Sequence, residues 1–110
     1  MPQDHLGEFE QIVLLSVVRL GDGAYGVPIR QEIEKRIGRQ VTVGALYSTL
    51  DRLEAKGYLQ SWFAEPTPKR GGRSKRYFQL LPAGLQALTD CKAMLDRMWR
   101  GVRLKGHHGV

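Results

Sequence analysis

Five basic side chains are concentrated in one short segment of the sequence. Within eight residues that include no acidic side chain, the segment carries Lys69, Arg70, Arg73, Lys75 and Arg76. Clustered Lys and Arg side chains create a strong local field, and their charged groups are the usual donors to phosphate oxygens. The chemistry that this segment suggests is the binding of a polyanion. A solvated run of charge without any partner is the alternative interpretation.

The rest of the chain is almost neutral. The 110 residues include 17 basic and 11 acidic side chains, which gives a formal net charge of +6. Outside the cluster, twelve basic residues face eleven acidic ones. A smaller basic group lies near the C-terminus, at Arg97, Arg100, Arg103 and Lys105. The positive charge is therefore mainly a property of residues 69–76.

Patterns that carry catalysis or cofactor binding are missing from the sequence. It has no Gly-rich phosphate loop followed by Lys-Ser or Lys-Thr, no Cys–His constellation and no carboxylate pair in an apolar context. His107 and His108 have no spaced Cys or carboxylate companion, so we expect no metal site. We also expect no cofactor and no catalytic residue. The single cysteine, Cys91, excludes an intrachain disulfide and is typical of a reducing cytoplasm.

The composition is that of an ordinary globular protein, with 42% hydrophobic and 25% charged residues. The longest apolar run, Ile12–Leu15, resumes after Ser16 with two valines. It is far shorter than the roughly 20 residues that a membrane-spanning helix needs. The chain also does not open with a signal-peptide pattern. We therefore expect neither membrane insertion nor secretion.

Helical periodicity marks two segments before residue 40. Over Leu6–Leu20, apolar residues recur on one helical face and Gly21 follows as a stop signal, although a buried strand over residues 12–18 is an alternative. Val27–Ile37 has Pro28 in its first turn and three isoleucines, at positions 29, 33 and 37, on one face. Gly38 can supply a left-handed C-terminal cap. We expect a helix in each segment.

A third helix is predicted between Thr42, a suitable N-cap residue, and Gly57. Leu46, Leu50 and Leu53 form its inward stripe. The opposite side carries small or polar residues, namely Gly44, Ala45, Ser48, Thr49, Arg52 and Lys56. Small side chains allow close approach to a surface, and hydroxyl and guanidinium groups can reach base edges or phosphates in a DNA groove.

The basic cluster lies in the loop of a predicted hairpin. Tyr58–Glu65 and Lys75–Leu80 are rich in aromatic residues and read as strands, and the residues between them include two prolines and two glycines. From Pro82 to about Leu104 the chain turns helical again. The seam of this helix contains Leu88, Cys91, Leu95, Met98 and Val102, spaced by three and four residues as in a heptad.

Three helices, a hairpin with a basic loop and a further helix are the order of a winged helix-turn-helix. We expect a mainly α protein with a small β-hairpin, in which residues 6–81 form the winged domain, 82–105 form a dimerisation helix and 106–110 form a flexible tail. The third helix would enter the major groove, and the wing would lie along phosphates.

The sequence resembles the PadR family of bacterial transcriptional regulators. The resemblance begins at Leu6-Gly-Glu-Phe-Glu and continues through Ala24-Tyr25-Gly26. It is strongest in residues 43–57, with the Leu-Tyr, Arg-Leu-Glu and final Gly elements, and in the wing Arg70-Gly-Gly-Arg73. It extends over about residues 6–88. One departure is Leu81, where relatives commonly carry a Thr that would cap the last helix.

The resemblance implies a homodimeric, repressor-type regulator that binds a pseudo-palindromic operator in double-stranded DNA, in the bacterial cytoplasm and at the nucleoid. It also implies that the C-terminal helix pairs the two subunits, and the apolar seam independently asks for a partner helix. The residues expected to bind DNA are Thr42, Gly44, Ala45, Tyr47, Ser48, Thr49, Arg52, Lys69, Arg70, Arg73, Lys75 and Arg76. Those expected at the dimer interface are Leu88, Cys91, Leu95, Met98, Trp99 and Val102.

Several residues keep two interpretations. Arg52 either contacts DNA, which we favour, or is merely solvated, because no acidic residue lies three or four positions away in its helix. Tyr47 either touches a phosphate or edges the core, and Trp62 is either exposed near DNA or packed beneath the wing. Trp99 either packs in the dimer core, which we prefer, or lines a pocket for a flat hydrophobic effector, as in some relatives. Cys91 is expected to be a small buried hydrophobe rather than a redox sensor.

A different class of function is also compatible with the pattern. A winged helix can serve as a protein-interaction module, with its basic wing on an acidic partner. The small side chains of the third helix argue mildly against this function, because protein interfaces prefer aromatic anchors.

Overall fold

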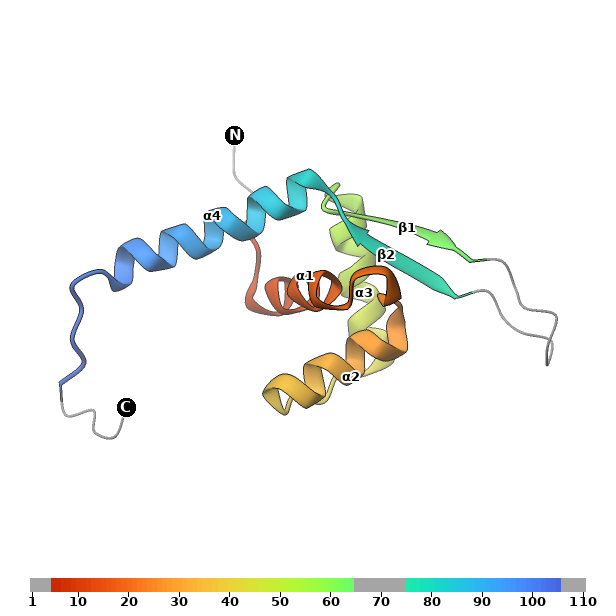
Figure 1. Cartoon of the computed structure of the whole chain (residues 1–110), viewed down its shortest axis with the longest axis horizontal. Coiled ribbons are helices and arrows are strands. Elements are labelled where there is room, and N and C mark those ends of the chain that lie inside the picture. Colours follow the sequence, from red (N-terminus) through yellow and green to blue (C-terminus); the bar gives the residue numbers. More distant parts are fainter. Residues whose placement is uncertain (1–4, 65–74, 106–110) are drawn as a thin grey trace.

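The computed structural model describes residues 5–64 and 75–105 of the chain. Figure 1 shows the order of the elements, which are α1 (Glu8–Leu20), η1 (Gly21–Gly23), α2 (Gly26–Ile37), α3 (Val43–Ala55), β1 (Leu59–Phe63), β2 (Arg76–Leu80) and α4 (Pro82–Trp99). The predicted class, mainly helical with a small antiparallel hairpin, is confirmed. Residues 12–18 lie inside α1, so the alternative of a buried strand is wrong.

The first three helices pack around one apolar core. Leu14 of α1, Ile29 of α2 and Leu46 of α3 have no exposed surface. The predicted inward stripe of α3 is confirmed, since Leu50 and Leu53 are also fully buried. The stripe of α2 is confirmed at residues 29 and 33 but not at Ile37, which is 53% exposed at the end of the helix. Burial of these side chains fixes the orientation of α3 on the other two helices.

Local signals define the turn between α2 and α3. Gly38 follows α2 in the left-handed region, with φ 68°, and its N–H donates to the carbonyl of Glu34. Thr42 precedes α3 in an extended conformation, and its hydroxyl accepts a hydrogen bond of 3.1 Å from the N–H of Ala45. Both caps are confirmed as predicted.

The two strands form the base of the wing. In the antiparallel register Leu59 faces Leu80, Ser61 faces Phe78 and Phe63 faces Arg76. The strands are shorter than predicted, because β1 begins one residue after Tyr58 and β2 begins one residue after Lys75. The N–H of Phe78 donates to the carbonyl of Ala24, and residues 25 and 77 form an isolated bridge. The segment before α2 therefore extends the sheet, which the sequence pattern did not indicate.

The last helix, α4, projects away from the body of the domain (Figure 1). It begins at Pro82 without a side-chain cap at Leu81, although the N–H of Leu81 donates to the carbonyl of Tyr58. Gly84 in its first turn lies against that same carbonyl so closely that a Cβ atom would collide with it. The base of α4 is thus seated on the turn between α3 and β1.

The predicted extent of the last helix is wrong at its C-terminal end. It ends at Trp99, and Gly101 follows in the left-handed region with φ 78°. Val102, which the heptad pattern placed in the seam, therefore lies beyond the helix. The predicted tail 106–110 lies outside the described residues.

Candidate DNA-binding surface

The N-terminal half of α3 presents an open face of small and polar residues. Gly44, Ala45 and Ser48 are exposed one turn apart, next to the capping residue Thr42, which is also exposed. A Cβ atom built at Gly44 would meet nothing within 4 Å, so packing inside the chain does not require a glycine at this position. These four predicted DNA-binding residues therefore share one accessible surface.

Two other predicted residues of α3 do not belong to this open face. Thr49, expected to point outward, is only 4% exposed, because it lies at the margin of α3 that packs on α1. Tyr47 is half-buried, with its ring centroid 6.5 Å from that of Phe78. The Tyr47 hydroxyl lies against Gly26, where any side chain would collide with it. The core-edge interpretation of Tyr47 thus describes its position, and the outward placement of Thr49 is wrong.

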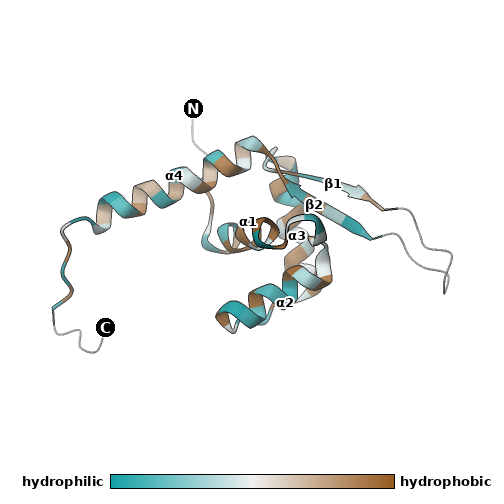
Figure 2. Ribbon diagram, in the orientation of Figure 1, coloured by the Kyte–Doolittle hydropathy of each residue, from teal (hydrophilic) through white to brown (hydrophobic). Residues whose placement is uncertain are grey.

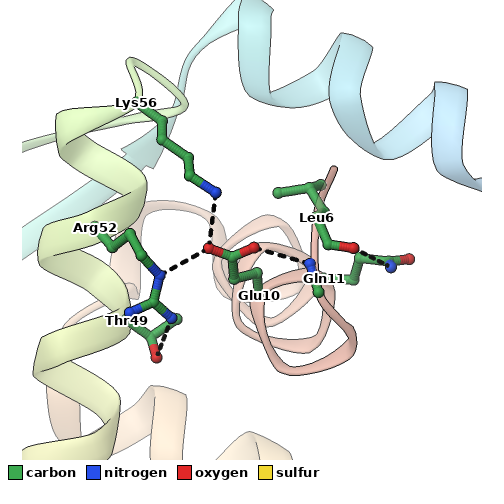
Figure 3. A network of polar contacts seen from close by, with 7 residues as sticks. Leu6, Glu10, Gln11, Thr49, Arg52 and Lys56 are labelled. Atoms are coloured by element: carbon green, nitrogen blue, oxygen red, sulfur yellow. Dashed lines mark hydrogen bonds and ion pairs between the residues drawn. The ribbon is translucent and has the colours of Figure 1, made fainter. Parts of the chain in front are cut away.

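Arg52 lies at the margin of the open face and is bound to a carboxylate on another helix. Its Nε donates to Oε2 of Glu10 at 2.9 Å, and the Nζ of Lys56 lies 3.1 Å from the same oxygen (Figure 3). A weaker contact of 3.4 Å joins Nη2 of Arg52 to the hydroxyl of Thr49. The ion pair therefore joins α1 to α3. It could not be predicted from the neighbours of Arg52 within its own helix.

Glu10 is a buried charge held by several donors. Its side chain is 8% exposed, whereas the side chain of Arg52 is 51% exposed. Oε1 of Glu10 accepts a hydrogen bond of 2.8 Å from the N–H of Gly7, so the carboxylate also caps the start of α1. Burial alone would raise the pKa of Glu10, but the hydrogen bonds from Gly7, Arg52 and Lys56 together hold that pKa below its ordinary value. The carboxylate is thus ionised and fixed in place.

Arg76, predicted to contact DNA from the wing, is instead bound to the other side of α3. Its Nη1 lies 3.0 Å from Oδ1 of Asp51, its Nη2 lies 2.6 Å from Oε1 of Glu54, and its Nε donates to the hydroxyl of Ser61 at 3.1 Å. The guanidinium also lies 4.9 Å from the centre of the Phe78 ring. Burial would lower the pKa of Arg76, and the bonds to both carboxylates raise it above its usual value. Arg76 fastens the wing to α3.

Aromatic rings cover the outer side of the wing. Trp62 stacks on Tyr77 with ring centroids 6.1 Å apart, and Tyr77 contacts Tyr25 at 5.2 Å. The ammonium of Lys75 lies 4.6 Å from the centre of the Tyr25 ring. Trp62 is therefore stacked on the wing and still 45% exposed. The remaining predicted wing residues, Lys69, Arg70 and Arg73, lie outside the described residues.

The predicted dimer residues differ in burial. Leu88 is 9% exposed and belongs to the core, and Cys91 is half-buried beside it. Farther along α4 the apolar side chains are open to solvent, with Leu95 48%, Met98 71% and Trp99 57% exposed. Figure 2 shows hydrophobic and hydrophilic positions alternating along the ribbon of α4. Within this chain nothing in the described residues covers them.

Across residues 5–64 and 75–105, no group of three His, Cys, Asp or Glu side chains is arranged to hold a metal ion. No described helix has the length and hydropathy needed to cross a membrane.

Comparison with known proteins identifies the family. The sequence matches the Transcriptional regulator PadR-like family over residues 14–90, which is well over half of the chain. The chain belongs to this family. It is 37% identical over 78 residues to the transcriptional regulator Rv3488 of Mycobacterium tuberculosis, a match that covers 71% of this chain and 68% of that protein.

Solved structures of transcriptional regulators share the fold. A PadR-like transcription factor from Bacteroides fragilis superposes with a TM-score of 0.73 and 25% identity, over 84% of each chain. A transcriptional regulator from Clostridium thermocellum gives a TM-score of 0.68 at 24% identity, over 83% of this chain and 85% of that one. This PadR-like chain is accordingly a DNA-binding transcriptional regulator of the winged-helix type and not an enzyme.

Sequence reasoning missed the roles of Glu10 on α1 and of Asp51 and Glu54 on α3, three carboxylates that bind the arginines at the two margins of α3. For Glu10 a signal was available, since a Glu three residues after the residue that precedes a helix is half of a capping box. The pairing of Asp51 and Glu54 with Arg76 had no such local signal, because it joins residues 22 and 25 positions apart.

Proposed function

We propose that this PadR-like regulator is a homodimeric repressor that binds a pseudo-palindromic operator, with α3 of each subunit in a major groove. The observation that carries the proposal is the open face of Gly44, Ala45 and Ser48, beside a half-exposed Arg52. Small side chains permit close approach to base edges, and Ser48 has a hydroxyl for hydrogen bonding. Aromatic anchors, which a protein interface would favour, are absent from this described face.

In this proposal the wing residues Lys69, Arg70, Arg73 and Lys75 neutralise phosphates beside the groove. The support is their concentration of positive charge, since the rest of the chain is nearly neutral. Arg76 is left out of this set, because its guanidinium is already bound to two carboxylates.

The dimer is proposed to form through α4. Its support is the exposed apolar side made by Leu95, Met98 and Trp99, which would remain in water in a single chain. Leu88 and Cys91 would continue the interface toward the winged domain. We further propose that a flat hydrophobic effector, where one acts, binds between the subunits at Trp99 and relieves repression. The dimer would operate in the bacterial cytoplasm, on the nucleoid.

A gel-shift titration against the DNA upstream of the gene tests the operator proposal. We expect binding to the upstream duplex to be tighter than to a random duplex of equal length, and to weaken steeply as salt rises. Arg73→Ala should lower affinity on every sequence, whereas Ser48→Ala should change base preference. Equal affinity for both duplexes at every salt concentration would remove the sequence-specific part of the proposal. Recovery of a stoichiometric protein partner without DNA would favour the interaction module.

Sedimentation equilibrium tests the dimer, with Met98→Asp as the variant and Lys92→Asp as a control on the same helix. The Met98 substitution places a charge on the apolar side and should give monomers, whereas Lys92 is exposed and pairs with Asp96 on the same helix. Quenching of tryptophan fluorescence by planar phenolic acids tests the effector site. No quenching would leave Trp99 as an interface residue without a ligand.

A further inference from the structure

We propose that Glu10 is a positioning residue for DNA binding: it holds the guanidinium of Arg52 in the orientation that meets a phosphate at the edge of the groove. The inference deepens the proposed function and rests on it, because it assumes that α3 lies against DNA. Neither the basic character of the chain nor the winged fold assigns any role to this carboxylate.

The carboxylate is well placed to act as a fixed support. Oε1 is bound to the N–H of Gly7 at 2.8 Å, and Oε2 accepts both Nε of Arg52 and Nζ of Lys56. With 8% of its side chain exposed, Glu10 has little room to change rotamer. Glu10 lies in the first turn of α1, so the packing of α1 on α3 determines the position of Oε2.

Arg52 is held by one edge only. Its Nε is bound to Glu10 and its Nη2 contacts Thr49, whereas its Nη1 has no hydrogen bond to any residue that the structure describes. Figure 3 shows the guanidinium between α3 and the carboxylate. Half of the side chain is exposed. An arginine that is already fixed through its Nε loses little further conformational freedom when its outer N–H groups bind a phosphate oxygen.

The charge of the cluster supports an anionic partner. One carboxylate faces two cations, so Glu10, Arg52 and Lys56 together keep a net charge of +1. Lys56 is the more enclosed of the two cations, with 20% of its side chain exposed against 51% for Arg52. The charge that remains is therefore displayed by Arg52, next to the open face of α3.

Glu10→Gln separates positioning from simple electrostatics, because the two predict opposite signs. Removing a negative charge near DNA should by itself raise affinity for any duplex. If Glu10 positions Arg52, affinity should instead fall, by about fivefold, since the amide holds the guanidinium less firmly. Glutamine still accepts the hydrogen bond from the Gly7 N–H, so the start of α1 is preserved. Thermal unfolding of each variant verifies that the fold is retained.

Glu8→Gln is the matched control. Glu8 lies two residues away in the same first turn, and its side chain is 84% exposed with a long ion pair of 3.4 Å to Arg39. The substitution changes the charge by the same amount without touching Arg52. We expect Glu8→Gln to leave affinity unchanged or slightly raised. An equal fall in both variants would assign the effect to the helix terminus and overturn the proposal.

A double-mutant cycle with Arg52→Ala links the effect to the arginine. In the Arg52→Ala background, Glu10→Gln should no longer lower affinity. The same fivefold loss in that background would overturn the proposal. Arg52→Lys provides a second variant that leaves Glu10 unchanged: it keeps the charge but lacks the planar fork, and we expect a loss similar to that of Glu10→Gln. Wild-type affinity in Arg52→Lys would show that orientation is irrelevant.

A measurement without DNA distinguishes failure of this inference from failure of the proposed function. The Nε–H resonance of Arg52 should exchange slowly with water in the wild type and rapidly in Glu10→Gln. Fast exchange in both would overturn the inference whatever DNA does. If the wild type bound upstream and random duplexes equally, operator recognition would fail. The affinity comparison would then be made on the random duplex, because phosphate contacts do not depend on sequence.

Discussion

The two margins of α3 carry ionic clusters of opposite composition. On the side of α1, one buried carboxylate, Glu10, binds two cations, Arg52 of α3 and Lys56 directly after that helix. On the side of the wing, one part-buried cation, Arg76, receives two carboxylates from α3, Asp51 and Glu54. The first cluster keeps a net charge of +1, and the second has a net charge of −1.

The difference shows that a basic residue beside α3 need not have its donors available to an external anion. Arg76 belongs to the most basic segment of the sequence, yet its donors are bound to Asp51, Glu54 and Ser61. Arg52 belongs to a nearly neutral helix and keeps half of its side chain exposed. The partners that each arginine has in the folded chain determine whether its donors are available for phosphates.

The largest effect on stability is expected when the first cluster loses its centre. Glu10→Ala removes the acceptor for Gly7 and leaves Arg52 and Lys56 without their shared carboxylate. We expect a loss of about 2 kcal/mol in the free energy of unfolding, below the usual cost of breaking a fully buried pair because Arg52 is half solvated. Urea denaturation measures it. A loss below about 0.5 kcal/mol would mean that the cluster contributes orientation without stability.

The second cluster should contribute less, because its carboxylates are partly solvated. Arg76→Met keeps much of the aliphatic packing and removes the guanidinium, and we expect a loss of about 1 kcal/mol. Adding Glu54→Gln to this variant should recover part of the loss, since the part-buried carboxylate would otherwise lack its cation. Additive losses in the double variant would contradict a direct link between the wing and α3.

The pH dependence of stability isolates Glu10. Because its folded-state pKa is lowered, Glu10 stabilises the fold above its unfolded pKa of about 4.3, and this contribution is lost as the pH falls through the folded-state value. As the pH falls from about 5 through the lowered folded-state pKa of Glu10, the wild type should therefore lose more stability than Glu10→Gln. Glu32, whose pKa is also lowered, through its bond to Arg36, affects both proteins equally. Parallel stability curves would show that Glu10 is not paired in solution.

The salt dependence of DNA binding is expected to show the smallest effect, but it distinguishes Arg73 from Arg76 most directly. Arg73→Ala should reduce the slope of log affinity against log salt by about 0.9, because one phosphate contact is lost. Arg76→Met should leave the slope unchanged, since Arg76 is bound within the protein. Gel-shift titrations at several salt concentrations measure both slopes. A reduced slope for Arg76→Met would restore the original expectation that it contacts DNA.

Local rules predicted the scaffold, and contacts between distant elements decided the site. The cap at Thr42, the left-handed Gly38 and the leucine stripe of α3 depend on neighbouring residues, and all were predicted. The end of α4 was misplaced because the heptad pattern continues past Gly101, a residue in the left-handed region that terminates the helix.

Thr49 and Arg76 were misplaced for different reasons. Thr49 was assigned to the polar side, although it lies three residues from Leu46 and four from Leu53 and so borders the inward stripe, which explains its burial. Arg76 lies at the end of a basic run, and only the strand register brings it to Asp51 and Glu54. The family resemblance supplied the type of site, whereas the partners of its arginines required the folded chain.

The absence of a side chain at Gly84 affects the direction in which α4 leaves the winged domain. Its contact with the carbonyl of Tyr58 seats the first turn of α4 on the winged domain. The 18 residues of α4 make a lever about 27 Å long, so a tilt of about 5° at this seat moves the far end by about 2 Å. In a dimer joined through α4, the spacing of the two DNA-binding helices would follow that angle. In such a dimer, the choice of glycine rather than alanine at position 84 would thus influence which spacing of operator half-sites the protein fits.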